Sequence, residues 1–410
     1  MKKDSKYLPV KAFILIYIFL VIIGYAALIL PGAAARPLTD VEALFTTISA
    51  VTLSGLQVCD FAGIFTSQGQ IIVLALIQLG AITAVSFSLY FGWLLGRASL
   101  FTDSEDLLNP GIKPFNAWLK IFKQTCIYLF VFELACSGIL YAFWNGDITF
   151  TTSQKLHYAF FHGVSVFCHS GFSNLEGNFS NPHVSHSYLL LLAVTGVIVL
   201  GSIGYAATFD LISIKRLRER MLNPKKNWTL QTRIALYATL ILITCGSICW
   251  FLAEQNDALK DQKLIEAAFT SIFNIAGARG AGFYSVNIGS FSPWLINIYM
   301  LLMIIGVSAS SPGGGIKTSF LSPNCWRIFR YIGNAFTLGA IIVFGLSYFI
   351  LQITDPIHST REIVFEIISA STNTGLSYGI TATLSLTGKY VIMGDMILGR
   401  IGIPVTLYLF

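Results

Sequence analysis

The stretch Ala43-Leu-Phe-Thr-Thr-Ile-Ser-Ala-Val-Thr-Leu-Ser-Gly55-Leu56 is the first of four related segments in this sequence. The others are Ala159-Phe-Phe-His-Gly-Val-Ser-Val-Phe-Cys-His-Ser-Gly171-Phe172, Ala268-Phe-Thr-Ser-Ile-Phe-Asn-Ile-Ala-Gly-Ala-Arg-Gly-Ala-Gly282-Phe283 and Val364-Phe-Glu-Ile-Ile-Ser-Ala-Ser-Thr-Asn-Thr-Gly375-Leu376. Each has a phenylalanine, then a serine, then small or polar residues, then a glycine followed by leucine or phenylalanine. They recur roughly 95 to 115 residues apart, so they form an internal repeat.

Each segment predicts a short helix that enters the membrane without crossing it. A helix of roughly 10 to 12 residues is too short to span a bilayer. Its carboxyl end carries a partial negative charge, and four such ends converging would stabilise a cation. The chain beyond each helix must be irregular, which is tolerated at membrane depth only where protein or water satisfies its polar groups. Glycine suits this position because it adopts positive φ and leaves carbonyls free to face an axis. Four ordinary surface loops are the alternative interpretation.

The composition indicates that the bilayer surrounds this repeat. Of 410 residues, 55% are hydrophobic and 11% are charged, and the mean hydropathy is +0.70. A soluble domain has about a quarter charged residues. Eight apolar runs are long enough to cross about 30 Å of hydrocarbon. They are Lys11–Leu30, Gln70–Leu95, Ala117–Phe143, Ser187–Ile212, Gln231–Leu252, Trp294–Ile305 continuing with interruptions to Phe320, Ile332–Ile353 and Lys389–Phe410.

The basic residues predict the orientation of these spans. Lysines precede the first span, and a basic segment, Lys215–Arg233, follows the fourth, whereas the loops on the opposite side are acidic. The positive-inside rule then predicts a multi-pass protein of the cell membrane with a cytoplasmic N-terminus. The net charge of +6 reflects this topology and does not indicate nucleic-acid binding.

These residues resemble the Trk/Ktr/HKT superfamily of potassium transporters, most closely the Ktr-type membrane subunit, over essentially the whole chain. Two further motifs carry the resemblance, Gly306-Val-Ser-Ala-Ser-Ser-Pro-Gly-Gly-Gly-Ile-Lys-Thr318 and Gly399-Arg-Ile-Gly402. It implies an all-α polytopic membrane protein with four units of helix, pore loop and helix, arranged with pseudo-fourfold symmetry around a central pore. We expect these units at residues 1–110, 111–222, 223–328 and 329–410.

The resemblance also implies that the four loop glycines form a selectivity filter that binds K⁺ through backbone carbonyls. Arg279, three residues before its glycine, would brace the outer loops. The predicted ion-binding residues are Leu53, Ser54, Gly55, His169, Ser170, Gly171, Gly280, Ala281, Gly282, Asn373, Thr374 and Gly375.

The sixth span breaks at Gly306 into small residues, and a proline with three glycines inside a span costs several kcal/mol of helix propensity. The resemblance implies that this break is an intramembrane gate below the filter, whereas a kink without gating function is the alternative. Arg400, charged within the last span, would interact with the gate and add an electrostatic barrier. Lys317 would cooperate with it or extend to the cytoplasmic surface. The predicted gate residues are Gly306, Ser310, Ser311, Pro312, Gly313, Gly314, Gly315, Lys317 and Arg400.

The function implied is potassium uptake, without catalysis and without a covalent cofactor. A sodium or mixed transporter of the same fold, or a cation-coupled solute carrier, is the alternative. Relatives imply a homodimer on a cytoplasmic KtrA/TrkA-like ring, whose subunits hold the nucleotide. The basic segment Lys215–Arg233 would dock that ring or attract lipid headgroups. The six histidines form no acid–base motif that would indicate an enzyme.

Two other patterns carry less weight. His162 and His169 are spaced for one helical face, but buried histidines of this kind are more often hydrogen-bonded than metal-bound; protonation of His169 could still weaken conduction. Among the cysteines, Cys59 and Cys168 are the pair that could face outward. Glu133 lies within a span, and Asp395 would pair with another span rather than with Arg400.

Overall fold

The computed structural model describes residues 8–94, 96, 98–109, 111–144, 151–223, 227–308, 310–318 and 342–409. Within these ranges the regular structure is helical, with one isolated β-bridge between Ala34 and Phe65. The all-α fold class is therefore confirmed.

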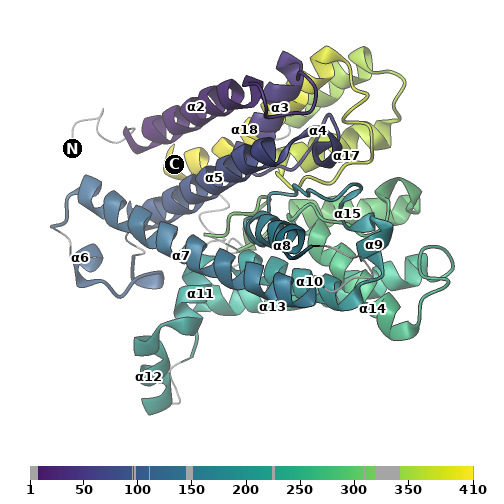
Figure 1. The fold of residues 1–410 in the computed structure, drawn as a ribbon. Coiled ribbons are helices and arrows are strands. Elements are labelled where there is room, and N and C mark those ends of the chain that lie inside the picture. The colour runs from purple at the N-terminus through teal and green to yellow at the C-terminus, as the bar shows by residue number, and fades with distance from the viewer. Residues whose placement is uncertain are drawn as a thin grey trace.

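The first unit shows how the sequence pattern becomes structure. Helices α2 (Leu8–Ile29) and α5 (Ser67–Leu94) are long and apolar, and the shorter α3 (Asp40–Thr52) lies between them in sequence. Helix α3 packs against both, and its second half is buried. It therefore behaves as an inner element enclosed by two spans, and Figure 1 shows the three helices adjacent to one another.

The same order of elements recurs along the chain (Figure 1). The second set is α7 (Pro114–Phe143), α8 (Thr152–Phe167), α10 (Tyr188–Ile203) and α11 (Tyr205–Ile212), and the third is α13 (Leu230–Glu254), α14 (Leu264–Ala278) and α15 (Pro293–Ile304). The fourth is the helix Ile342–Thr354 with α17 (Thr360–Ser371) and α18 (Leu386–Leu409). Short elements connect them: α4 (Phe61–Ile64), η1 (Ala98–Leu100), α6 (Glu105–Leu108), η2 (Asn178–Ser180), α9 (Pro182–Ser185), α12 (Ile214–Leu222) and η3 (Ile288–Ser290).

Capping residues fix where the inner helices begin. A serine or threonine at the cap accepts from the N–H three residues on, and a Glu or Gln at that position accepts from the cap N–H. This reciprocal pattern starts three of the four inner helices, and in the remaining one the Glu266 carboxylate accepts from the Lys263 N–H at 3.1 Å. The three pairs are Thr39 with Glu42, Thr151 with Gln154, and Ser359 with Glu362.

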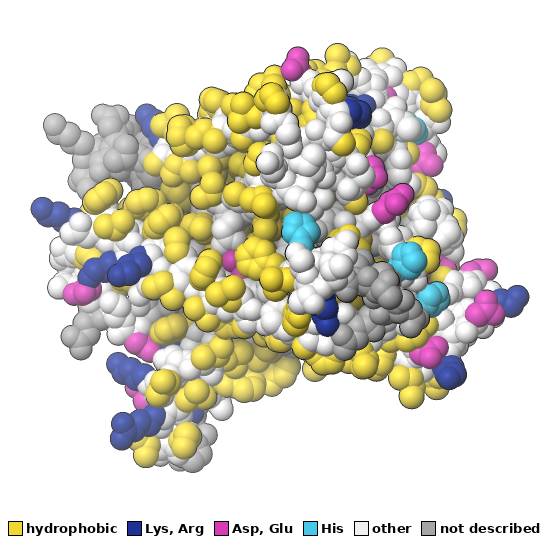
Figure 2. All heavy atoms as spheres, viewed as in Figure 1, with side chains coloured by type: hydrophobic (Ala, Val, Ile, Leu, Met, Phe, Trp, Pro, Cys, Tyr) yellow, Lys and Arg dark blue, Asp and Glu magenta, His cyan; other side chains and the backbone are white. Residues whose placement is uncertain are grey.

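Large apolar side chains cover the outside of the bundle. Leu15 and Phe19 of α2 are more than half exposed, as are Phe130 and Val131 of α7. Figure 2 shows these yellow side chains as a broad belt across the visible face. Exposing such a large apolar surface to water is unfavourable, whereas contact with the hydrocarbon of a bilayer is not. Four described helices are long and apolar enough to cross a membrane, or five if the bent pair α10 and α11 is counted as one span. The chain is a multi-pass membrane protein.

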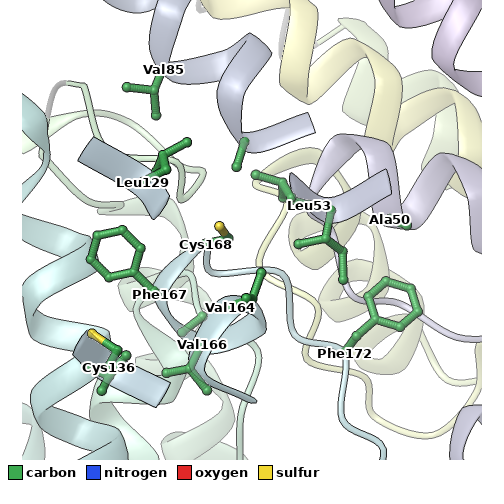
Figure 3. Packing of buried hydrophobic residues seen from close by; sticks show 14 of the residues in the cluster. Ala50, Leu53, Val85, Leu129, Cys136, Val164, Val166, Phe167, Cys168 and Phe172 are labelled. Atoms are coloured by element: carbon green, nitrogen blue, oxygen red, sulfur yellow. The ribbon is translucent and has the colours of Figure 1, made fainter. Parts of the chain in front are cut away.

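The core lies between the inner helices and the spans. Figure 3 shows Val85 of α5 and Leu129 of α7 facing Val164 and Phe167 of α8, with Leu53 from the end of α3 close by. All five are nearly inaccessible. This packing holds the carboxyl ends of α3 and α8 near one another.

Two predictions, one about a span and one about the inner helices, differ from the structure. The fourth predicted span, Ser187–Ile212, is not straight: α10 and α11 meet at Gly204 with a bend of 99°. The prediction of one helix relied on an unbroken run of apolar residues. Such a run shows that a segment can lie in lipid, but it does not show that the helix is unbroken. The inner helices have 12 to 16 residues, so three of them exceed the predicted length. Part of the predicted span Ile332–Ile353 lies outside the described residues.

Candidate ion pathway

The four inner helices end in loops of one shared conformation. Gly55, Gly171, Gly282 and Gly375 all have positive φ, between +72° and +85°. The residue two positions earlier also has positive φ in every loop, namely Leu53, His169, Gly280 and Asn373. Three of these four earlier residues are not glycine, and a non-glycine residue in this region is uncommon. The repetition of a rare conformation at matching positions indicates one structural role for the four loops.

The four loop glycines form a closed ring. A β-carbon placed on Gly55 would lie 2.8 Å from the Gly171 Cα, and one placed on Gly171 would lie 3.5 Å from the Gly282 Cα. One on Gly282 would lie 3.4 Å from the Gly375 Cα, and one on Gly375 would lie 3.0 Å from the Gly55 Cα. The sequence predicted that these glycines meet at one axis, and the structure brings them together.

Hydroxyl groups hold the chain just beyond two of these glycines. Ser49 Oγ donates to the Leu56 carbonyl at 2.8 Å, and Ser165 Oγ donates to the Phe172 carbonyl at 2.5 Å. In the third loop the matching contact is steric, since a β-carbon on Gly277 would collide with the Phe283 carbonyl oxygen. Each of these three inner helices therefore lies directly against the outward-going chain that follows its own loop.

A second brace acts further from the ring, between residues 11 positions apart. His162 Nε2 lies 2.9 Å from Ser173 Oγ, and Asn274 Nδ2 donates to Ser285 Oγ at 2.8 Å. Glu366 Oε1 accepts from Ser377 Oγ at 2.5 Å. Sequence reasoning did not identify Asn274. The pattern that could have identified it is a polar residue eight or nine positions before the loop glycine, on an otherwise apolar helix.

The two histidines of the second loop have separate partners. His162 contacts Ser173 and the Tyr158 carbonyl. His169 Nδ1 lies 3.0 Å from the Gly280 carbonyl oxygen, and Nε2 lies 3.1 Å from that of Ile198. His169 therefore ties the second loop to the third. Among the described residues no cluster of three His, Cys, Asp or Glu could hold a metal ion.

Carbonyl groups of the third loop have protein donors beside them. The Gly280 carbonyl faces the His169 ring, and Asn178 Nδ2 donates to the Gly282 carbonyl at 3.4 Å. A carbonyl oxygen has two lone pairs, so each can still face a cation. These contacts fix the direction of both carbonyls.

The position of Cys168 corrects one expectation. Cys168 is fully buried rather than facing outward, and its thiol donates to Glu133 Oε1 at 3.1 Å. In Figure 3 Cys168 lies between Leu129 and Leu53, at the start of the second loop. The expectation treated the whole loop as an external segment, whereas α8 carries its end into the interior.

The predicted gate segment lies directly against the loops. Helix α15 ends at Ile304, and the chain then turns back so that the Ile316 N–H donates to the Ile304 carbonyl at 2.9 Å. A β-carbon on Gly313 would lie 3.0 Å from His169 Nδ1, and one on Gly314 would lie 3.1 Å from the Asn373 Cβ. The segment therefore touches the second and fourth loops, and glycine is required at position 314, where a β-carbon would collide with the Thr372 carbonyl oxygen.

The same segment is hydrogen-bonded to the bend between α10 and α11. The Ser308 N–H donates to the Ser202 carbonyl at 3.0 Å, and the Tyr205 N–H donates to the Ser310 carbonyl at 3.1 Å. Ser311 Oγ donates to the Gly201 carbonyl at 2.8 Å. Both helix breaks expose backbone groups that need partners at membrane depth, and here they satisfy each other. Sequence reasoning missed this bend, although two glycines three residues apart, in Gly201-Ser-Ile-Gly204, marked it.

The two cations of the gate have different partners. Lys317 Nζ donates to the Ser311 carbonyl at 3.1 Å and also to the Gly313 carbonyl, so it braces the loop rather than extending to the surface. Arg400 Nε donates to Tyr17 Oη at 3.4 Å, across to the first span. The described hydrogen bond of Arg400 thus goes to α2 and not to the gate segment, while its charge still repels that of Lys317.

Two other intramembrane charges reach neighbouring helices. Arg279 is buried, and its NH1 donates to Thr239 Oγ1 of α13 at 2.6 Å rather than to the outer loops. Asp395 accepts from Ser347 Oγ at 2.8 Å, on another span as expected.

Comparisons with known proteins agree with this geometry. The family model described as TrkH, cation transport protein, matches residues 5–331 and 321–410. Ktr system potassium uptake protein D of Bacillus subtilis is 30% identical, over 98% of this chain and 93% of that protein. Ktr system potassium uptake protein B of the same organism is 27% identical over the same shares. The crystal structure of the potassium transporter TrkH from Vibrio parahaemolyticus superimposes with a TM-score of 0.73 at 16% identity, covering 98% of this chain and 84% of that one.

The likeness to the solved structure establishes the fold, including the pseudo-fourfold arrangement of the four repeats. The family match and the curated relatives extend this over nearly the whole length. The chain belongs to the TrkH family of cation transport proteins.

Proposed function

We propose that this protein takes up potassium ions through the ring formed by Gly55, Gly171, Gly282 and Gly375. The closed ring of loop glycines is the observation that carries the proposal. Relatives whose names state potassium uptake support the identity of the ion.

The filter would consist of the backbone carbonyls of the four loops. The carboxyl ends of α3, α8, α14 and α17 precede those loops, so their partial negative charges favour a cation there. Backbone carbonyls replace the water that an alkali cation loses on entry. Glycine in all four loops favours potassium over sodium, by analogy with the superfamily.

The gate would be the segment Gly306–Thr318. It lies against two of the filter loops, and the Lys317 ammonium holds its Ser311 and Gly313 carbonyls. Arg400 would add a positive barrier on the same path. Conduction requires the segment to move away from the ring of loop glycines. We expect deletion of Ser311–Gly314 to raise unregulated flux, and an unaltered flux would contradict the gate.

The assembly and topology extend this proposal. We infer four units at residues 1–110, 111–222, 223–328 and 329–410, and a cytoplasmic N-terminus. We also infer a homodimer that docks on a cytoplasmic ring of KtrA/TrkA-like subunits, which bind the regulatory nucleotide. The word "system" in the relatives' names supports a partner subunit.

Growth of a potassium-uptake-deficient cell at limiting potassium tests the function. Expression of this chain with a compatible ring subunit should restore growth, and purified protein in liposomes should pass K⁺ in preference to Na⁺. Rescue by sodium-selective flux would favour the sodium alternative, and solute-dependent cation flux would favour a coupled carrier. Absence of any cation flux from folded protein contradicts the proposal.

A further inference from the structure

Helix α12 (Ile214–Leu222) stands apart from the bundle. Figure 1 shows it projecting at the end where α6 and the N-terminus lie, across the direction in which α5 and α7 run. A helix in that position lies roughly parallel to a membrane that α5 and α7 cross. It also lies to the side of the bundle rather than along its axis.

One face of α12 is fixed to the protein by Asp210 of α11. Asp210 Oδ1 accepts from Arg216 at 3.3 Å and from Arg220 at 3.2 Å. Arg216 also pairs with Asp103 at 3.2 Å. Asp210 Oδ2 accepts from the Thr229 N–H at 2.9 Å, which joins the start of α13 to the same cluster. These contacts pair the charges of Arg216 and Arg220 with carboxylates. They also fix which face of α12 points outward.

The opposite face is apolar and uncovered. Ile214 is 83% exposed and Met221 is 82% exposed, and Leu217 and Leu222 are exposed as well. Residues at positions 214, 217 and 221 share one side of a helix with 3.6 residues per turn. Arg216 and Arg220 occupy the other side, so the apolar stripe points away from Asp210.

Basic side chains flank this stripe. Lys215 and Arg218 are exposed, and neither forms an ion pair with a described residue. Figure 2 shows this projection with basic side chains along its left edge and apolar side chains beside them. Apolar residues beside unpaired cations are typical of helices that lie in a membrane interface.

The chain that follows α12 also exposes apolar side chains. Trp228 is exposed in the link to α13, and tryptophan is enriched where membrane meets water. Tyr237 and Leu240 of α13 follow it on the lipid-facing exterior, both more than half exposed. Exposed apolar side chains that face lipid therefore follow α12 in the chain.

We propose that α12 binds the anionic phospholipid surface of the cytoplasmic leaflet, with Ile214, Leu217 and Met221 inserted below the headgroups and Lys215 and Arg218 bound to their phosphates. Charge complementarity and the lipid-facing side chains that follow α12 in the chain both support this partner. A regulatory ring beneath the bundle axis would meet elements that project along that axis, and α12 projects to the side. The proposal does not depend on which ion is transported.

Quenching of a fluorescent label by nitroxide-labelled phosphatidylcholine tests it in the full-length protein. The label is placed at Met221→Cys after the other accessible cysteines are changed to alanine. The protein is reconstituted in nanodiscs of phosphatidylcholine alone or mixed with phosphatidylglycerol, at a constant nitroxide content. We expect stronger quenching in the anionic discs, because the headgroup charge draws the helix into the interface.

Two double variants separate specific binding from a general effect of charge. Lys215→Gln with Arg218→Gln should abolish the increase caused by phosphatidylglycerol. Lys113→Gln with Lys123→Gln removes the same charge from exposed positions of the second unit and should leave the increase intact. Both pairs are on the surface, and a gel-filtration profile checks the fold.

Three results would overturn the proposal. One is equal quenching in both lipid mixtures, which leaves no role for headgroup charge. Another is equal loss of quenching in the two double variants. The third is a label that the nitroxide lipid does not quench and that is protected from aqueous iodide only in discs that hold two copies of the protein. That result would show that the apolar face of α12 contacts a second copy of the chain rather than lipid.

Discussion

Gly55, Gly171, Gly282 and Gly375 satisfy two separate demands. Their φ values lie in the left-handed region, where a side chain costs about 1–2 kcal/mol per residue. Their α-carbons also lie against those of neighbouring loops, so any β-carbon would meet backbone. Either demand alone favours glycine, and together they exclude other residues without displacement of a loop.

Replacing Gly55 by serine should lower the K⁺ flux and the preference for K⁺ over Na⁺. A β-carbon there lies 2.5 Å from the Ser170 carbonyl oxygen, so the first and second loops must separate and the carbonyls lose their spacing. Parallel K⁺ and Na⁺ fluxes into proteoliposomes measure the ratio. Gly138→Ser is the matched control, since nothing lies within 4 Å of a β-carbon on Gly138 in α7. An unchanged ion ratio in Gly55→Ser would contradict the filter.

Glu42 makes the outer end of α3 sensitive to acid. Hydrogen bonding from Arg36, with further bonds from Thr39, lowers the pKa of Glu42 from 4.5 to about 2. A carboxylate with a lowered pKa stabilises the fold fully above its ordinary pKa, and this contribution is lost as the pH falls toward the folded value. The loss therefore belongs between pH 4.5 and about pH 2.

The thermal midpoint of the purified protein in this pH range measures the effect. Glu42→Gln keeps the capping hydrogen bond but cannot titrate, so its midpoint should fall less steeply with acid than that of the wild type. Asp106→Asn is a control, because its carboxylate is largely exposed beside Lys120. Parallel curves for wild type and Glu42→Gln would show that the Arg36 contact contributes no measurable stability.

At the scale of elements, the bend at Gly204 and the gate segment form one unit. Gly204 has φ 79° and ψ 161°, a conformation that is essentially restricted to glycine. The bend exposes the Gly201 and Ser202 carbonyls, and these accept hydrogen bonds from the gate segment. Movement of the gate must therefore break these bonds or carry the bend with it.

Replacing Gly204 by alanine should destabilise the protein by about 1–3 kcal/mol, the cost of forcing a side chain into this conformation. It should also raise K⁺ leak in the absence of a regulator. The chain around residue 204 would relieve its backbone strain by shifting the Gly201 and Ser202 carbonyls, which are hydrogen-bonded to the gate segment. Gly196→Ala, in the regular part of α10 and with open space at its β-carbon, should leave both unchanged. Chemical denaturation and liposome flux measure the two effects. If Gly204→Ala and Gly196→Ala had the same stability and the same K⁺ leak, the bend would have no role in gating.

At the scale of the whole molecule, charge is divided between the two ends of the bundle. Figure 2 shows clusters of Lys and Arg at the end that carries α6 and α12, and His with most of the visible acidic side chains, among further Lys and Arg, toward the other. The long helices between the ends carry the apolar belt. By the positive-inside rule, we propose that the end with α6 and α12 is the cytoplasmic one.

A membrane-impermeant maleimide should distinguish the two ends. In a background without accessible native cysteines, Glu176→Cys should react in intact cells, because Glu176 is exposed in the loop after the second filter segment. Asn223→Cys, exposed after α12, should react only after the membrane is opened. The reverse pattern would invert the proposed topology and place α12 outside the cell.

Much of the fold could be predicted from local patterns. Apolar runs of helical length gave the spans. The capping residues Thr39 and Ser359 carry a local signal for the start of an inner helix that the sequence predictions did not use. The loop glycines were predicted because positive φ is a demand of the local chain. Each of these properties depends on residues within one or two helical turns, so the sequence alone carries it.

The tertiary structure decided which polar groups meet. His169 contacts the carbonyl of Gly280, 111 residues away, and Ser311 contacts that of Gly201, 110 residues away. The pairing of Arg400 with Tyr17, 383 residues away, arises in the same way. A buried polar group needs a partner, but its own neighbours in sequence do not specify which one. The amino-acid sequence determined the four helix–loop–helix repeats and their glycines, whereas only the folded chain determined what holds them against the gate, because those hydrogen bonds join segments that meet only after the repeats have packed.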